Sequence, residues 1–390
     1  MATQSELFKN NISQVLRCIW LHEGISRVDI SKELQMDKST VTKIVSYLLD
    51  IDVIKTEDEG EAKVTGGRKP VPLSINVDFG CIIGIEIQTD SYIGVITNLR
   101  GEVISLQSNK MDYSNMDLVE SFCKIVDELK PFTAPYDLLG IVLGLSGIIN
   151  PFDGVVIKSN PMNIYEEYKF VEKIKEKTDI PVLIENDANC CCWGELTSLK
   201  RERPRNMIFI LGEFREVETH HAYYPGIGFG FGIVIDGKVY YGSEFSAGEF
   251  KSLFSKAPSV SQFSLQDSDI ENIQNKPEEL MKLLRELCVN VSLVINFFNI
   301  NEIIIGGAVE QYYDIISLML SQEIQRNWLY PGQMTYNIVT SNQSQKSVAY
   351  GAACMFLERL FGIPDINSST HEVLQGVELL EKLKLIHIKE

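Results

Sequence analysis

Residues 184–196 read IENDANCCCWGEL, and this stretch decides how the rest of the chain is interpreted. Its apolar beginning predicts a short buried strand that ends at Asn186 and Asp187. A carboxylate at a strand end can accept a hydrogen bond from a hydroxyl or take its proton as a base. The cysteines at 190–192 would point about 100° apart on a helix, so we expect them to pack as small apolar side chains rather than to form one site.

Strand-like and helical segments alternate on both sides of this stretch. The strand-like runs are CIIGIEIQ, SYIGVITN, EVISLQSN and LLGIVLGLSG before it, and NMIFILGE, FGIVIDGKVYYG, EIIIGG and TYNIVT after it. Helical patterns lie between them, near 116–130 and up to about residue 320. Two successive series of this kind predict an α/β protein with two lobes and a cleft between them.

The expected domain boundaries follow from this pattern and from the length of 390 residues, which is too long for one ordinary core. We expect an N-terminal domain over residues 1–75, a first lobe over 76–190 and a second lobe over 191–364. A C-terminal helix within 365–390 is expected to return to the first lobe.

Charge is distributed unevenly along the chain. The net charge is −17, yet residues 1–49 hold six lysines and arginines against five aspartates and glutamates. The N-terminal domain can therefore approach phosphates, while the acidity lies in the later domains. The sequence has no signal-peptide pattern and no apolar run of the roughly 20 residues that a membrane helix needs, so we expect a cytoplasmic protein without a membrane partner. Eight cysteines without a CxxC spacing predict neither disulfides nor a zinc site.

The N-terminal domain has the pattern of three helices with short connections. Helices are expected over 5–22, from Ser26 onward, and over 38–49. The outward face of the third helix holds hydroxyls and lysines and no carboxylate, which is typical of a recognition helix that donates to phosphates and base edges. A plain three-helix bundle with a polar surface is the alternative. The candidate DNA contacts of this domain are Arg27, Lys38, Ser39, Thr40, Thr42, Lys43 and Ser46.

Residues 53–75, VIKTEDEGEAKVTGGRKPVPLSI, read as a strand, an acidic turn and a second strand, which is the pattern of a β-wing. Within this segment Arg68 and Lys69 follow two glycines and form a basic arm that can enter a narrow minor groove. A simple linker between domains is the alternative, and both interpretations can hold together.

Motifs that occur in a set order extend over nearly the whole chain. They are GGRKPVPL, IGIEIQTDSYIGVITNLRGEVI, GLSGIINPFDG, IENDAN, GIGFGFGIVIDGKVYYGSEFSAGE, EIIIGGAV and SVAYGAACMFLERLFG. With them the chain resembles the ROK family (repressors, open reading frames, kinases), in the branch of transcriptional regulators with an N-terminal winged helix that includes xylose-type and N-acetylglucosamine-type repressors. The resemblance implies two actin-like, ribonuclease-H-like lobes that clasp a sugar, and a homodimer or homotetramer.

The resemblance also implies a catalytic counterpart for Asp187. In the family's kinases the matching aspartate takes a proton from the sugar hydroxyl that attacks the γ-phosphate. The first phosphate loop of those kinases has a pattern like Asp-x-Gly-Gly-Thr. This chain has Glu86 at the aspartate position and Gln88 and Thr89 at the glycine positions, so side chains crowd the loop, and Asp90 adds a negative charge near it. Residues 77–80, VDFG, are an alternative position for the loop. We therefore expect no catalytic residue, no enzyme activity and no efficient phosphoryl transfer.

The other family motifs differ in how well they are kept. The second phosphate loop retains Gly226 and Gly228 but lacks its usual threonine-glycine entry. On the adenosine side Gly306 and Gly307 remain, although such a pair also serves a tight strand-helix turn. The sugar side is better preserved, because four polar residues match family positions that contact sugar hydroxyls. These sugar-binding candidates are Asn163, Asn186, Asp187 and Glu249.

After Glu249 the family continues with a histidine and then cysteines that hold a structural zinc. This chain continues with Phe250, Lys251 and Ser252, so no zinc and no other cofactor is expected. The sequence thus predicts a sugar-responsive regulator, a repressor of carbohydrate-utilisation genes, whose partners are operator DNA and a monosaccharide. Three alternatives stay open: a sugar kinase with an attached DNA-binding domain, a regulator that no longer binds sugar, and an activator.

Overall fold

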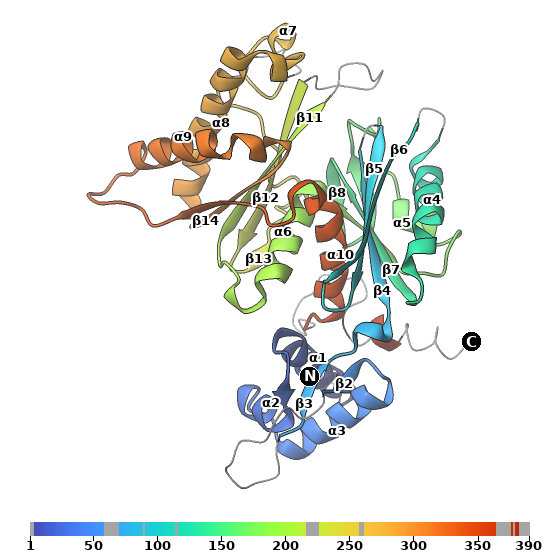
Figure 1. The fold of residues 1–390 in the computed structure, drawn as a ribbon. Helices are drawn as coiled ribbons and strands as arrows, with labels where there is room; N and C mark the ends of the chain where they lie inside the picture. Colours follow the sequence, from blue (N-terminus) through green and yellow to red (C-terminus); the bar gives the residue numbers. More distant parts are fainter. Residues whose placement is uncertain are drawn as a thin grey trace.

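The computed structural model describes residues 4–57, 70–88, 90–113, 116–215, 226–256, 261–363, 376 and 379–381. Three units are seen in Figure 1, a small N-terminal domain at the bottom and two larger lobes above it. Each lobe is built on a five-stranded sheet, and the N-terminal domain holds a three-stranded one. The expected fold class, an N-terminal helix-turn-helix followed by two α/β lobes, is confirmed.

The N-terminal domain consists of three helices and a small antiparallel sheet of order β1-β3-β2. Its elements are α1 (Gln4–Leu21), β1 (Ile25–Ser26), α2 (Arg27–Glu33), α3 (Lys38–Asp50), β2 (Ile54–Thr56) and β3 (Pro72–Ile75). Ser26 caps α2, because its hydroxyl oxygen accepts from the Asp29 amide at 3.3 Å and donates to the Asp29 carboxylate at 2.6 Å. The inward side chains of α3 are all fully buried. The three predicted helices and the two wing strands are therefore confirmed.

The first lobe contains a mixed sheet of order β10-β7-β4-β5-β6. Its elements are η1 (Val77–Phe79), β4 (Cys81–Ile87), β5 (Ser91–Asn98), β6 (Val103–Lys110), α4 (Leu118–Leu129), η2 (Lys130–Thr133), β7 (Leu138–Leu145), β8 (Ile148–Asn150), β9 (Val155–Lys158), α5 (Phe170–Ile174), β10 (Val182–Asn186), α6 (Asp187–Leu199) and η3 (Lys200–Glu202). Strands β4, β7 and β10 are parallel, so their carboxyl ends meet at one edge. Asn186 therefore lies beside Leu145 and close to the end of β4.

The second lobe repeats this plan with a sheet of order β13-β12-β11-β14-β15. Its elements are β11 (Met207–Arg215), β12 (Gly226–Ile235), β13 (Lys238–Val239), α7 (Asp267–Ile270), η4 (Ile273–Asn275), α8 (Pro277–Phe298), β14 (Glu302–Gly307), η5 (Ala308–Tyr312), α9 (Tyr313–Arg326), β15 (Asn337–Thr340) and η6 (Ser344–Lys346). Helices α8 and α9 cover the side of this sheet that is turned away from the first lobe (Figure 1). No helix in the described ranges is long and apolar enough to cross a membrane.

The last long helix, α10 (Ser347–Leu360), leaves the second lobe and packs on β4, β5 and β7 of the first lobe and on α6. The helix that returns to the first lobe is thus α10, which lies within the range 191–364 that the sequence analysis assigned to the second lobe. Small residues permit this packing, because a Cβ on Gly84 would collide with α10 and a Cβ on Gly351 would collide with α6. Of the range 365–390 only Gly376 and residues 379–381 are described.

Candidate functional site

The outward face of α3 carries the polar side chains that the sequence analysis selected. Lys38, Ser39, Thr42, Lys43 and Ser46 are exposed, and Thr40 is half-buried. The Thr42 hydroxyl donates to the Lys38 carbonyl at 2.7 Å, so it is left with acceptor capacity toward a ligand. Asp50, the last residue of α3, adds an exposed carboxylate at the end of this face, and Asp37 precedes the helix. The first turns of α3 therefore present hydroxyls and lysines to solvent, as a recognition helix would.

The other candidates for DNA contact differ from this pattern. Arg27 at the start of α2 is half-buried, and its Nε is buried without a hydrogen-bond partner. Its guanidinium is thus less accessible than the lysines of α3. Arg68 and Lys69 lie outside the described residues.

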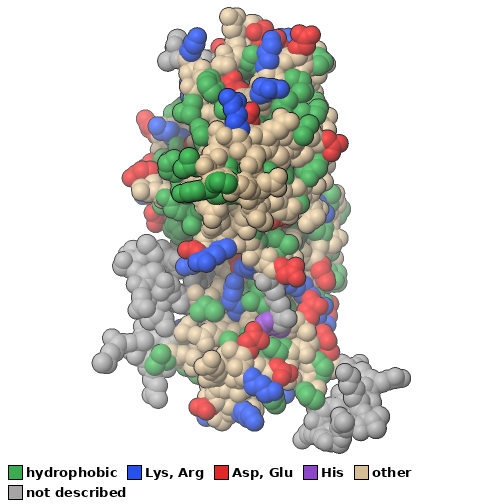
Figure 2. All heavy atoms as spheres, turned by 90° about the vertical axis from the view of Figure 1, so that its left-hand side faces the viewer, with side chains coloured by type: hydrophobic (Ala, Val, Ile, Leu, Met, Phe, Trp, Pro, Cys, Tyr) green, Lys and Arg blue, Asp and Glu red, His purple; other side chains and the backbone are tan. Residues whose placement is uncertain are grey.

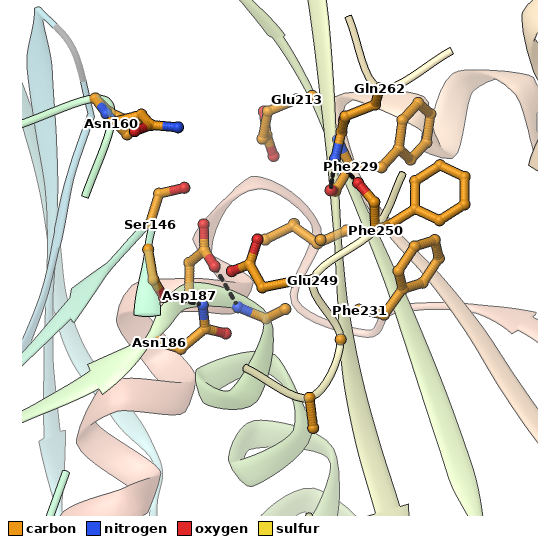
Figure 3. A pocket seen from close by; sticks show the side chains of 18 residues that line it. Ser146, Asn160, Asn186, Asp187, Glu213, Phe229, Phe231, Glu249, Phe250 and Gln262 are labelled. Carbon is orange, nitrogen blue, oxygen red and sulfur yellow. Dashed lines mark hydrogen bonds between the residues drawn. The ribbon is translucent and has the colours of Figure 1, made fainter. Parts of the chain in front are cut away.

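A cavity of about 130 Å³ lies between the two lobes (Figure 3). Its wall comes from the carboxyl edge of the first sheet, the start of α6, strands β11 and β12, and the segment 247–250. The lining residues are Ser146, Gly147, Asn160, Pro161, Asn186, Asp187, Ala188, Leu211, Glu213, Gly228, Phe229, Gly230, Phe231, Ala247, Gly248, Glu249, Phe250 and Gln262. No lysine, arginine or histidine is among these described residues. The cavity therefore offers carboxylates, amides and a hydroxyl against aromatic rings.

Asn186 and Asp187 stand where β10 becomes α6, and they have different tasks. Asn186 is the cap of the helix, because its Oδ1 accepts from the Asn189 amide at 3.0 Å and its Nδ2 donates to the Gly147 carbonyl at 2.9 Å. The Asp187 Oδ1 accepts from the Ala188 amide at 2.8 Å, and the carboxylate points into the cavity (Figure 3). Asn186 thus positions the wall, and Asp187 faces the ligand space.

The asparagines of the loop after β9 are placed differently from the prediction. Asn160 lines the cavity, whereas Asn163, the residue selected from the sequence, is exposed and does not. Asn163 has a left-handed backbone with φ of 52°, and its Oδ1 accepts from the Tyr165 hydroxyl at 3.4 Å. Ser146, which the sequence analysis missed, extends its hydroxyl into the cavity from the end of β7 (Figure 3). The glycine-rich turn GLSG was the available signal for it.

Glu249 reaches the cavity from the second lobe and faces Asp187 across it (Figure 3). The residues that follow do not fit a zinc ion, since neither Phe250, Lys251 nor Ser252 is a usual zinc ligand. Hydrogen bonds fix the segment instead: the Ser252 hydroxyl oxygen accepts from the Asn290 side chain at 3.1 Å, and the Leu253 amide donates to Asn290 Oδ1 at 2.9 Å.

Aromatic packing adds to this support. Phe250 contacts Phe231 and Phe263 edge-on, with ring centroids 5.2 Å and 5.6 Å apart. Gln262 donates from its side chain to the Phe250 carbonyl at 3.0 Å. An aromatic cluster and amide hydrogen bonds therefore hold the segment that follows Glu249.

The first phosphate-loop region is filled by side chains. Glu86 is 7% exposed, one of its oxygens accepts from Gln88 Nε2 at 2.9 Å, and the other has no hydrogen-bond partner. Burial, with the nearby Glu213 and Asp187 carboxylates, raises the pKa of Glu86 to about 8. Thr89 lies outside the described residues. A buried carboxyl group, hydrogen-bonded to Gln88, therefore lies near the end of β4.

The second phosphate region is also changed. Gly226 and Gly228 lie within the regular strand β12, paired to β11, rather than in a loop. Gly307 ends β14 with φ of 76°, and a Cβ there would collide with the Glu213 carboxylate. A Cβ on Gly306 would collide with the Phe209 ring. These two glycines therefore allow close packing, and Glu213, which the sequence analysis did not select, lies against the adenosine-side turn.

The cysteines after Asp187 are core residues. Cys190, Cys191 and Cys192 are at most 1% exposed, and burial raises the pKa of each thiol well above its ordinary value. The sulfur of Cys192 would meet a Cβ on Gly232, so this side of α6 packs tightly on β12. Their predicted role as small apolar side chains is confirmed.

Among the residues that the structure describes, Cys18, His22 and Glu33 form a cluster of residue types that can bind metals, at the junction of α1 and α2. His22 Nδ1 is 3.7 Å from Cys18 Sγ and 3.0 Å from the Cys18 carbonyl, and His22 Nε2 is 3.3 Å from Glu33 Oε1. The thiol and the carboxylate thus face different nitrogens of one ring, which does not suit a single ion. This contact holds α1 against α2.

The fold and the site define a two-lobed protein of the sugar-kinase type that carries a winged helix. Residues 82–251 match the model of the ROK family. The chain contains a ROK family domain, as its motifs predicted.

Relatives cover both parts of the chain. A xylose repressor of Caldicellulosiruptor bescii is 25% identical over 418 residues, covering 94% of this chain and 100% of the relative. A ROK family transcriptional regulator described as a homologue of the E. coli MLC protein superposes with a TM-score of 0.74 at 19% identity, over 97% of this chain and 99% of that one. A ROK family glucokinase from Streptomyces griseus, in complex with glucose and AMPPNP, gives 0.55 at 17% identity over 71% of this chain and 99% of that one. At these identities the two structures show a shared fold.

Proposed function

We propose that this protein is a DNA-binding transcriptional repressor that responds to a monosaccharide bound between its lobes. The observation that carries the proposal is the combination, in one chain, of a helix whose outer face carries only hydroxyls and lysines over residues 38–46 and a polar cavity that Asp187 and Glu249 enter from opposite lobes. Similarity to xylose repressors over almost the whole chain supports it.

The effector that suits the cavity is a single unphosphorylated sugar. A space of about 130 Å³ is smaller than the pockets of roughly 300–1,000 Å³ that hold drug-sized ligands. The carboxylates of Asp187, Glu213 and Glu249 can accept hydroxyl hydrogens, and the lining offers no cation to a phosphate. A pentose such as the xylose in the relatives' names is the first ligand to try.

We also infer that the protein does not transfer phosphate. Asp187 could serve as a base, but a phosphoryl donor needs groups that neutralise its charge. Here Gln88 stands at a position where the resemblance places a glycine of the first phosphate loop, and the Glu213 carboxylate lies against Gly307. Repulsion between the Glu213 carboxylate and phosphates disfavours nucleotide binding.

Helix α6 gives the sugar a route to the DNA-binding domain. It starts at Asp187 in the cavity and ends at Leu199, about 20 Å away at 1.5 Å per residue. Beyond it, Lys200 pairs with Glu23 of the N-terminal domain at 3.3 Å, and the Arg203 guanidinium lies 5.8 Å from the Trp20 ring. A shift of α6 on ligand binding would therefore change the contacts of Trp20.

Trp20 is the centre of this contact. It is 1% exposed, its Nε1 donates to the Leu99 carbonyl at 3.1 Å, and its ring stacks on Phe361 at 4.9 Å. Arg203 also donates to the buried Glu358 of α10 at 3.1 Å. Since α10 packs along α6, both helices can transmit a change in lobe closure.

The protein acts on DNA as an oligomer in this proposal, because one recognition helix covers one half-site. Ligand-linked movement would change the spacing of two recognition helices and so weaken operator binding. An activator would use the same machinery, and the position of the operator relative to the promoter would decide the sign.

The test uses duplexes selected from a random library by the purified chain, with fluorescence anisotropy as readout. Lys43→Ala is expected to weaken binding and to lower the slope of log K against log salt by about 0.9, as for one lost phosphate contact. The matched control Lys110→Ala changes an exposed lysine of the first lobe and should leave both unchanged.

Sugar response is measured on the same complexes. One monosaccharide of a pentose, hexose and amino-sugar panel is expected to release the protein from DNA without ATP. Failure to select any duplex would contradict the DNA-binding part, and selection without release by any sugar would favour a regulator that has lost its effector.

A further inference from the structure

A buried hydrogen bond joins the two lobes next to the residues that line the cavity. The Tyr241 hydroxyl of the second lobe donates to Glu185 Oε2 of the first lobe at 2.7 Å, and we call this contact the interlobe bond. Glu185 is fully buried, and Trp193 Nε1 donates to the same oxygen at 3.1 Å. Neither partner of the interlobe bond is among the described residues that line the cavity, so the bond is separate from the proposed sugar contacts.

The interlobe bond connects the segments that carry the sugar-facing carboxylates. Glu185 lies in β10, two residues before Asp187. In the second lobe the Tyr241 carbonyl accepts from the Ala247 amide at 3.1 Å, which closes the loop that leads to Glu249. The separation of the two carboxylates across the cavity therefore depends on the interlobe bond.

Aromatic contacts extend from the interlobe bond to α10. The Tyr241 ring meets Phe152 of the first lobe edge-on, with centroids 5.2 Å apart, and the Arg359 guanidinium of α10 lies 5.6 Å from the centre of the Phe152 ring. Next to Arg359, Glu358 accepts from Arg17 of the N-terminal domain at 3.5 Å. The hydrophobic side chains that Figure 2 shows on the outer side of the second lobe belong to a different surface. A movement of Tyr241 can thus reach the N-terminal domain through Phe152 and α10.

Burial makes the interlobe bond costly to break. It raises the pKa of Glu185, and the hydrogen bonds that this carboxyl group accepts act in the opposite direction. Burial also raises the pKa of Tyr241 well above its ordinary value, so the hydroxyl keeps the proton that it donates. Removing one donor from a buried carboxyl group costs more than removing an exposed hydrogen bond.

We propose that the interlobe bond holds the lobes in the arrangement in which Asp187 and Glu249 face each other, and that Tyr241 is thereby a positioning residue for sugar binding and for release of DNA. This inference rests on the proposed function. A bond between the lobes is intact only while they are closed, and a sugar that contacts both carboxylates favours the same state. Sugar binding and the interlobe bond therefore stabilise each other, although they share no atom.

Tyr241→Phe removes the hydroxyl and keeps the ring that packs on Phe152. The dissociation constant of D-xylose, or of the panel sugar that binds wild type, should rise about 10-fold by calorimetry, as for one lost hydrogen bond to a carboxylate. The sugar concentration that releases half of the selected duplex should rise by the same factor, while affinity for the duplex without sugar is not reduced. A merely structural role would instead weaken sugar and DNA binding together.

Tyr92→Phe is the matched control. Tyr92 is buried in the first lobe, and its hydroxyl donates to Glu128 at 2.7 Å, the same distance as in the interlobe bond. This variant loses a hydrogen bond of the same kind within one lobe. Its affinities for sugar and for DNA should therefore equal those of wild type.

Hydrogen exchange of the full-length protein without ligand separates this inference from the proposed function. Peptides that cover residues 241–249 should exchange about 5-fold faster in Tyr241→Phe than in wild type, and at the wild-type rate in Tyr92→Phe. Faster exchange in Tyr241→Phe, together with a wild type that binds no sugar of the panel, would contradict the proposed function and still support a bond that holds the lobes. Wild-type exchange, wild-type sugar affinity or reduced DNA affinity in Tyr241→Phe would each overturn the inference.

Discussion

The two halves of the interlobe cleft present different side chains. The sugar half presents Asp187 at the start of α6 and Glu249 from the opposite lobe, both directed at one cavity. The nucleotide half has the buried Glu86 at the end of β4 and the Glu213 carboxylate against Gly307. The same pair of lobes thus presents two carboxylates to the cavity on one side, and on the other a buried carboxyl group and the Glu213 carboxylate beside Gly307.

In the proposed function, a two-lobed fold serves recognition without phosphoryl transfer. Binding a neutral sugar requires only hydrogen-bonding groups at the cavity, whereas transfer also requires a site that neutralises a triphosphate. Closure of the lobes matters in both cases. Helices α6 and α10 contact the N-terminal domain at their far ends, so a change in closure can move that domain.

The largest expected effect comes from the sugar half. Asp187→Asn keeps the acceptor oxygen for the Ala188 amide but removes the charge that strengthens hydrogen bonds from sugar hydroxyls. A charged hydrogen bond is worth about 1.5–3 kcal/mol, so the dissociation constant of the sugar should rise about 10- to 100-fold by calorimetry. The control Asp179→Asn changes an exposed carboxylate of the same lobe. Unchanged affinity in Asp187→Asn would remove Asp187 from the site.

A smaller effect is expected from the nucleotide half, as a dependence of stability on pH. The pKa of Glu86 is about 8 in the folded protein, above that of a carboxyl in an unfolded chain. Below about pH 4 this group is neutral in both states, and its contribution to stability is lost as pH rises toward and through 8. Glu86→Gln should therefore become more stable than wild type by roughly 1–3 kcal/mol at pH 9 and differ less at pH 5.

Thermal unfolding at a series of pH values measures this difference. Glu166→Gln, a change at an exposed loop position, serves as control and should follow wild type throughout. Parallel curves for wild type and Glu86→Gln would show that Glu86 ionises as an ordinary carboxyl does.

The smallest expected effect concerns metal. Phe250, Phe263 and Asn290 hold the segment after Glu249 by packing and hydrogen bonds, so a chelator should leave Tm unchanged to within about 1 °C. Metal analysis of the purified protein accompanies the scan. A loss of several degrees on chelation, restored by zinc, would show that a metal stabilises the second lobe.

Local patterns predicted the parts of this architecture that local forces determine. The buried stripe of α3 and the cap at Ser26 follow from helical periodicity and one side-chain hydrogen bond. Asp187 and Glu249 were found because each belongs to a short motif whose side chain enters the cavity.

Other features depend on contacts between distant segments. The Glu213 carboxylate meets Gly307 only because β11 pairs with β14, and the choice between Asn160 and Asn163 depends on the conformation of one loop. The return of α10 to the first lobe requires small residues on two elements far apart in the chain, at Gly84 and Gly351. None of these pairings has a local signature.

Calorimetric titration of the purified protein with a monosaccharide panel and with Mg-AMPPNP tests the central claim most directly. The account predicts that one sugar binds with the same dissociation constant with or without nucleotide, and that the nucleotide alone gives no binding heat. Nucleotide binding with a dissociation constant below about 1 mM, in the presence or absence of sugar, would contradict it.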